Sequence, residues 1–445
     1  MKPLWEKLQS LQCHFTWQFE KEGQVNAAHI LKMLALQAEH TPHRNHATFI
    51  AMKAYLQHLQ GDYREALGSL REAEEVLKRD HLANFSRQAL VTYGNYAWVY
   101  YHLANFDMVE LYLGRIRETC RSLASSETYS VLTPEIHAQK GWSLLAVGFR
   151  NREEAQECFR MALQGDESNE EFNAGLATSV YACWTHSFRY DLCKEAQRLL
   201  EEVVLSQPQN YEAKAYLVNV LLTTSTGWRA NSLMEDVVQN SLNPEVLRNV
   251  ARLKKPNSFP KQIPRAISIL KQAVALDPGY HLLHYDLGQC YKNEMERASP
   301  EKREEMLAAA TESFQQAVET DPPFIFPRLE LAKLYREKSP AYEEEMYLTL
   351  MEGLPGVSKR CQQAIYLHWG DFLLHKKGLK HQALEMYQAG FGIVDGHINE
   401  KRQLKARLVD LAKMFQEDSE MHQAESIYHI VGFPYAQRSG CKFSK

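Results

Sequence analysis

The feature that most limits how this chain can fold is a pattern of small, aromatic and proline residues in units of about 34 residues. The clearest copy occupies these positions: Ala266, Leu270, Ala273 and Pro278, followed by Leu287, Gly288 and Tyr291. A second copy has the same order: Ala310, Phe314, Ala317 and Pro322, followed by Leu331, Ala332 and Tyr335. Small residues that face aromatic residues at helical spacing let two antiparallel helices pack closely. The pattern therefore predicts a chain of helical pairs.

The same register continues along most of the chain, with further copies in residues 61–73, 142–162, 196–208, 369–390 and 411–428. One match to so loose a pattern is weak evidence, but several matches in one register indicate tetratricopeptide repeats. Stacked pairs of this kind form a superhelix whose concave face binds an extended ligand. We therefore predict an all-α tetratricopeptide-repeat superhelix that forms a clamp around a central groove.

Stretches rich in glycine, proline and serine interrupt the repeats at residues 223–233, 253–263 and 353–358. If these stretches are bends between subdomains, they divide the chain into three parts: residues 1–222, residues 223–352, and residues 353–445 with a short tail. Simple loop insertions in one uniform solenoid would explain the same stretches equally well.

Composition and motifs exclude several classes of protein. No apolar run approaches the roughly 18 residues of a membrane span, and the first residues lack the apolar core of a secretory signal. The eight cysteines are scattered without C-x-x-C spacing, which favours buried, reduced thiols in a cytoplasmic protein. Phosphate-binding, dinucleotide-binding and metalloprotease motifs are all missing, and His375 and His381 lack ligand spacing. We expect no enzyme activity, no cofactor, no metal and no membrane association.

A basic stripe extends from Val246 to Leu276, where the sequence contains no acidic residue. Its cations are Arg248, Arg252, Lys254, Lys255, Lys261, Arg265 and Lys271. Such a stripe along the lining of a solenoid would make the groove basic, neutralise phosphates and bind nucleic acid without reading its sequence. The alternative is a solvated basic face that neighbouring acidic residues balance.

Four short sequence motifs resemble those of the interferon-induced proteins with tetratricopeptide repeats, a vertebrate antiviral family. They are CHFTW at 13–17, GNYAWVYYH at 94–102, KGW at 140–142 and LGQCYK at 287–292. The resemblance implies a helical clamp whose basic tunnel captures the 5′ end of single-stranded RNA. RNA-binding members recognise a 5′-triphosphate or an incompletely methylated cap and restrain viral translation. Other members act mainly through hetero-oligomers with their relatives.

The resemblance also implies candidate RNA-binding residues. Trp142 stands at the family's cap-stacking tryptophan, although it also occupies a repeat position typical of core packing. Gln37 falls near a glutamine of the family's RNA pocket, and Lys32 lies about one helical turn before it. The remaining candidates follow motif positions or supply nearby charge: Arg150, Arg152, Tyr181 and Tyr285, together with Arg248, Arg252, Lys254 and Lys255 of the stripe.

The chain departs from the family pattern where RNA-binding members grip phosphate. Ala146 stands in place of a lysine, Ala182 in place of an arginine, and Asp286 adds a carboxylate near Tyr285. Because the lysine and the arginine are missing, we expect weak selection for a 5′-triphosphate. Two functions remain: an antiviral effector that binds single-stranded RNA, or a non-enzymatic protein scaffold of the same pathway with a decayed RNA site.

Overall fold

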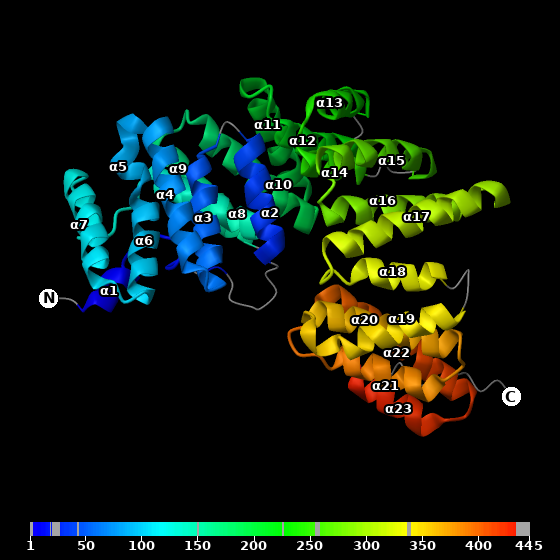
Figure 1. Ribbon diagram of the computed structural model, residues 1–445. Coiled ribbons are helices and arrows are strands. Elements are labelled where there is room, and N and C mark those ends of the chain that lie inside the picture. The colour runs from blue at the N-terminus through cyan, green and yellow to red at the C-terminus, as the bar shows by residue number, and fades with distance from the viewer. Residues whose placement is uncertain are drawn as a thin grey trace. The chain divides into compact units, whose positions relative to one another are not determined.

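The computed structural model describes residues 3–17, 19, 27–41, 44–148, 151–224, 227–253, 259–335 and 340–432. Within these ranges the chain forms α-helices and short 3₁₀ turns, and no β-strand occurs there (Figure 1). The predicted all-α fold is confirmed. None of the helices in these ranges is long and apolar enough to cross a membrane.

The chain divides into two compact units, Met1–Leu276 and Asp277–Lys445. The helices of the first unit are α1 (Leu4–Gln9), α2 (Ala27–His40), α3 (His46–Leu59), α4 (Tyr63–Asp80), α5 (Phe85–Gln88), α6 (Leu90–His102), α7 (Phe106–Ser122), α8 (Pro134–Val147), α9 (Arg152–Gly165), α10 (Glu170–Ser187), α11 (Tyr190–Ser206), α12 (Tyr211–Thr223), α13 (Gly227–Asn240), α14 (Pro244–Ala251) and α15 (Phe259–Leu276). A 3₁₀ turn, η1 (Leu82–Asn84), precedes α5.

The second unit contains α16 (His281–Met295), α17 (Pro300–Thr320), α18 (Phe326–Tyr335), α19 (Pro340–Glu352), α20 (Lys359–His375), α21 (Lys380–Phe391), α22 (Ile398–Glu417) and α23 (Met421–Ile430). A 3₁₀ turn, η3 (Leu354–Gly356), lies between α19 and α20. The unit boundary falls inside the segment 223–352 that the sequence set apart, and the three-part division stays a prediction.

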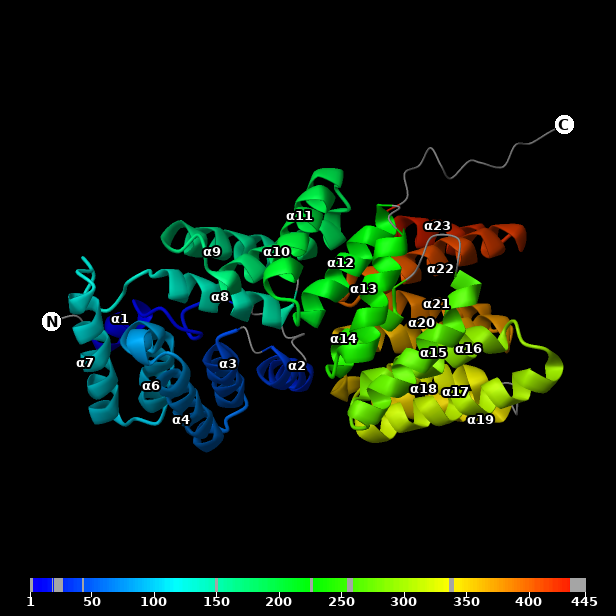
Figure 2. The same cartoon turned by 90° about the horizontal axis from the view of Figure 1, so that it is seen from above.

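Consecutive helices pack as pairs, as Figure 2 shows for the first unit. The pairs there include α3 with α4, α6 with α7, α8 with α9, α10 with α11 and α12 with α13. In the second unit the corresponding pairs are α16 with α17, α18 with α19, α20 with α21 and α22 with α23. This is the arrangement that tetratricopeptide repeats produce.

Close approach of one aromatic ring to two glycines joins the α8–α9 pair to α10. The Phe159 ring of α9 is fully buried between Gly141 of α8 and Gly175 of α10. A Cβ atom added at Gly141 would lie 2.8 Å from this ring, and one added at Gly175 would lie 2.1 Å from it. Only a glycine leaves room for the ring at either position. The predicted packing of small residues against aromatic ones is confirmed here.

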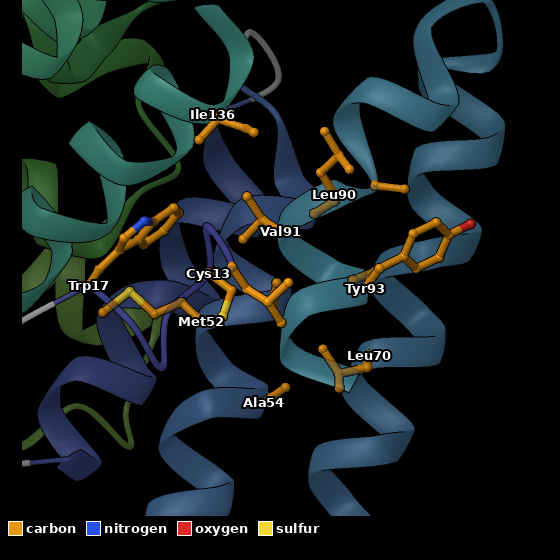
Figure 3. Packing of buried hydrophobic residues seen from close by; sticks show 14 of the residues in the cluster. Cys13, Trp17, Met52, Ala54, Leu70, Leu90, Val91, Tyr93 and Ile136 are labelled. Atoms are coloured by element: carbon orange, nitrogen blue, oxygen red, sulfur yellow. The ribbon is translucent and has the colours of Figure 1, made fainter. Parts of the chain in front are cut away.

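The segments CHFTW and GNYAWVYYH pack against each other in the core of the first unit. Cys13 and His14 are fully buried, and a Cβ at Gly94 would lie 2.7 Å from the Cβ of Cys13. Figure 3 shows Cys13 in the same buried cluster as Met52 of α3. The residues that carry the family resemblance therefore hold the N-terminal segment on α3 and α6.

A buried hydrogen-bond network extends from this core to α8. Asn95 Nδ2 lies 2.9 Å from His14 Nδ1, and His14 Nε2 lies 3.0 Å from the hydroxyl oxygen of Ser143. Burial lowers the pKa of His14 to about 3, so the imidazole is neutral. Since Ser143 follows Trp142 in α8, this network fixes the segment that carries the tryptophan.

Candidate functional site

Side chains of six helices of the first unit, α2, α3, α8, α10, α12 and α14, line a cavity of about 490 Å³. Gln37 comes from α2, Trp142 from α8, Tyr181 from α10 and Glu212 from α12, while Arg252 follows the last residue of α14. The volume is within the usual range of ligand-binding cavities, about 300–1,000 Å³. A second cavity of about 210 Å³ adjoins it, because Glu212 lines both.

Trp142 lines the larger cavity although only 2% of its surface is exposed. The edge of its ring system meets the Phe159 ring at a centroid distance of 5.0 Å. The guanidinium carbon of Arg44 lies 3.8 Å from the centre of its ring, in cation–π contact. The tryptophan is thus both a packed residue of the repeat and a wall of the cavity.

Arg44 is held in this position by a buried polar cluster. Its guanidinium forms an ion pair with Glu212, and the two side chains are 6% and 13% exposed. Gln37 Nε2 and the Tyr216 hydroxyl each donate a hydrogen bond to Glu212 Oε1, both at 3.0 Å. Burial alone would raise the pKa of Glu212, but Arg44, Gln37 and Tyr216 together hold it below its usual value. Glu212 is therefore a carboxylate at neutral pH.

A second carboxyl group, that of Glu171, lies at the start of α10 near the same cluster. Its Oε1 accepts a hydrogen bond of 3.1 Å from the backbone N–H of Asn45. Burial raises the pKa of Glu171 to about 7, against the opposing effects of the Asn45 N–H and the Arg44 charge. Glu171 consequently titrates close to neutral pH.

Two stacked tyrosines also line the cavity. The rings of Tyr181 and Tyr216 lie 4.3 Å apart at an angle of 20°. Asn219 Nδ2 donates a hydrogen bond of 2.8 Å to the Tyr181 hydroxyl. Burial raises the pKa of both phenols, so both remain neutral donors and acceptors. Flat aromatic surface beside polar groups is typical of sites that bind single-stranded nucleic acid.

The charges that line the larger cavity differ from the basic groove that the sequence predicted. Among the described lining residues, Arg252 and His29 are the basic side chains, and Glu212 and Glu245 the acidic ones. Arg248 of the predicted stripe is not among the lining residues. Its guanidinium pairs at 3.2 Å with Glu245, which does line the cavity.

The structure brings four of the predicted site residues to this cavity: Trp142, Gln37, Tyr181 and Arg252. Lys32 lies on α2 but is not among the lining residues. Arg152 pairs with Glu153 at 3.0 Å. Tyr285 belongs to the second unit, where its ring packs against Phe324 at 5.3 Å and burial raises its pKa to about 12.

Three of the predicted residues, Arg150, Lys254 and Lys255, lie outside the described residues. Ala146 lines the cavity, as expected for a residue one turn after Trp142, whereas Ala182 is fully buried and does not line it. No group of metal-ligating side chains occurs in the described ranges. The RNA-binding role of each predicted residue stays a prediction.

Sequence reasoning missed Arg44, Glu171, Glu212 and Tyr216. Arg44 and Glu212 are separated by 168 positions in the chain, and no local motif marks either of them. The one usable local signal is Asn45, whose side chain accepts a hydrogen bond from the Ala47 N–H and caps α3. A helix cap predicts where α3 begins but not which residue the preceding arginine contacts.

No model of a known protein family matches the chain. Interferon-induced protein with tetratricopeptide repeats 3 of Mus musculus is 30% identical over 69% of this chain and 76% of the relative. Antiviral innate immune response effector IFIT1 of Macaca fascicularis is 29% identical over 86% of this chain and 82% of the relative.

The human IFIT1 dimer has been solved with PPP-AAAA and with m7Gppp-AAAA. The two structures match 99% of this chain and 100% of their own, with TM-scores of 0.67 and 0.68 and identities of 27% and 26%. The similarity thus extends through both units and through the helices that enclose the cavity. By sequence and by fold, the chain belongs to the interferon-induced proteins with tetratricopeptide repeats.

Proposed function

We propose that this protein is an interferon-induced antiviral effector that binds single-stranded RNA in the cavity of its first unit and so restrains viral translation. It acts in the cytoplasm, without catalysis, and assembles with related members of its family. The human IFIT1 structures with PPP-AAAA and m7Gppp-AAAA support this proposal, because their similarity covers 99% of this chain.

The observation that carries the proposal is the meeting of Trp142, Tyr181 and Gln37 at one cavity. Aromatic faces bind bases by stacking, and polar side chains beside them contact the ribose-phosphate chain. The cavity is large enough for a nucleotide-sized group. Residues from α2, α8 and α10 therefore supply the two kinds of contact that a single strand needs.

The same cavity supports weak selection for the 5′ end. Ala146 offers no charge, and Glu212 and Glu245 add negative charge to the lining. A triphosphate carries several negative charges and needs matching cations or N–H donors. We expect the protein to bind single strands with modest preference among 5′-triphosphate, capped and 5′-hydroxyl ends.

The test is fluorescence anisotropy with PPP-AAAA and the matching 5′-hydroxyl oligonucleotide, at salt concentrations from about 50 to 200 mM. We expect affinity to fall as salt rises. Trp142→Ala should weaken binding by less than the roughly 5- to 150-fold that a freely stacked base supplies, because the Arg44 guanidinium lies 3.8 Å from its ring centre. The matched control is Trp228→Ala, because Trp228 is 76% exposed on α13 and does not line the cavity.

Thermal unfolding of both variants shows whether a loss of affinity reflects lost contacts or a less stable fold. Trp142→Phe keeps an aromatic face and should retain part of the affinity. Wild-type protein that binds neither oligonucleotide at low salt would refute the RNA-binding function. The protein scaffold of the same pathway would then be the better explanation.

A further inference from the structure

We propose that Arg44 determines what can stack on Trp142, because its guanidinium covers one face of the Trp142 ring. In the wild-type protein this face is closed to a base, and it becomes available only when Arg44 is displaced. The proposal rests on the proposed function, since it concerns the ligand of the same cavity.

The distance between the two groups leaves no space for a base. The guanidinium carbon of Arg44 lies 3.8 Å from the Trp142 ring centre, which is contact distance for stacked atoms, about 3.5–4.0 Å. A base stacked on this face would have to lie in the same layer. Arg44 and a stacked base therefore exclude each other.

The backbone beside Arg44 is fixed, so that displacement would involve the side chain. The Asn45 N–H donates to Glu171 Oε1 at 3.1 Å, and Asn45 Nδ2 donates to Gln88 Oε1 at 2.9 Å. The Asn45 side chain also caps α3. With these contacts retained, the arginine can leave the ring by rotation about its own side-chain bonds.

The ion pair of Arg44 with Glu212 lies beside both of the cavities described above. Trp142 and Gln37 line the larger one, Arg44 lines the smaller one, and Glu212 lines both. Rotation of Arg44 away from Trp142 would open the larger cavity toward the smaller one. The space gained lies over the ring face, where a terminal base could enter.

An uncharged base cannot take over the electrostatic role of Arg44. Glu212 is 13% exposed and forms its ion pair with this arginine, and a buried carboxylate that loses its partner is unfavourable. Removing the guanidinium and the carboxylate together avoids this penalty. The double substitution Arg44→Ala with Glu212→Gln should therefore free the Trp142 face without leaving an unpaired charge.

The test compares binding of Gppp-AAAA to the wild type and to the Arg44→Ala, Glu212→Gln variant by isothermal titration calorimetry. We expect the variant to bind at least about tenfold tighter, within the range of about 5- to 150-fold that one stacked base supplies. Adding Trp142→Ala to the variant should abolish this gain. A gain below about threefold, or one that survives removal of the ring, would overturn the proposal.

The matched control is Arg198→Ala with Glu202→Gln, which removes the same charges from an exposed ion pair on α11. It should leave binding unchanged. Glu212→Gln alone is a second variant that keeps the side-chain volume and loosens Arg44, so it should give a smaller gain in the same direction. If both folded variants bind like the wild type, Arg44 does not control the ring.

These outcomes separate the proposal from the function on which it rests. If the wild type binds single strands and the variant shows no gain, the proposed function stands and the role of Arg44 is overturned. If the wild type binds no RNA but the variant shows a gain that depends on Trp142, the role of Arg44 is supported. RNA binding by the natural protein is then contradicted.

Discussion

Replacing Ala146 by lysine should give the cavity a preference for a 5′-triphosphate. Ala146 lies four residues after Trp142 on α8, so both residues project from the same face of the helix. The alanine lines the cavity and is half-buried. A lysine side chain at this position can extend into the cavity and bring an ammonium group to a phosphate.

The size of the effect follows from the contacts that the ammonium can make. A hydrogen bond to a charged group contributes about 1.5–3 kcal/mol, which corresponds to roughly 10- to 150-fold in affinity. The carboxylates of Glu212 and Glu245 line the same cavity and compete for the new charge. We therefore expect the lower end, about tenfold in favour of the triphosphate.

The assay is a competition between PPP-AAAA and the same oligonucleotide with a 5′-hydroxyl, carried out on the wild type and on two variants. Ala146→Gln is the matched control, because it adds similar length without charge. Equal preferences in Ala146→Lys and Ala146→Gln would refute the argument. A wild-type preference of about a hundredfold or more, about 2.7 kcal/mol, would show that other residues already grip the phosphates.

Two further predictions concern pH and salt. Burial raises the pKa of Glu171 from an ordinary 4.5 to about 7. Between these two pH values the folded protein keeps a proton on Glu171 that the unfolded chain has lost. The free energy of unfolding should therefore fall as pH rises through this range. Glu171→Gln should consequently be more stable than the wild type at pH 8, by roughly 1–3 kcal/mol, with a smaller difference below pH 5, as measured by urea unfolding. Replacing Lys254 and Lys255 by glutamate should weaken binding to all single strands alike and flatten its salt dependence in anisotropy titrations; an unchanged slope would make the stripe a solvated face.

The fold was predictable because the repeat pattern is a direct record of packing. Phe159 needs glycine at both positions that its ring approaches, Gly141 and Gly175, and this requirement appears in the sequence as small residues at fixed intervals from an aromatic one. Such constraints are local to one repeat and its neighbour. A single sequence can therefore reveal them.

The site was only partly predictable, because its central contact joins residues that are far apart in the chain. Trp142 stands within a recognisable repeat, and Tyr181 follows from the family resemblance; both line the cavity. Arg44 lies between two helices, outside any repeat position, and its partner Glu212 is 168 residues away. Burial of both charges results from the stacking of repeats, which no local motif encodes.

The residues that carry the family resemblance and those that line the cavity are under different physical constraints. His14 is fully buried and is hydrogen-bonded within the core, so that most replacements would remove buried hydrogen bonds to Asn95 and Ser143. Ala146 faces a cavity, where a change of side chain costs little folding free energy and directly alters the charge that a ligand meets. In this chain the CHFTW motif is therefore constrained by stability, whereas under the proposed function the choice of ligand depends on residues such as Ala146 and Arg44. Assigning a member to this family consequently leaves its 5′-end preference to be derived from the cavity itself.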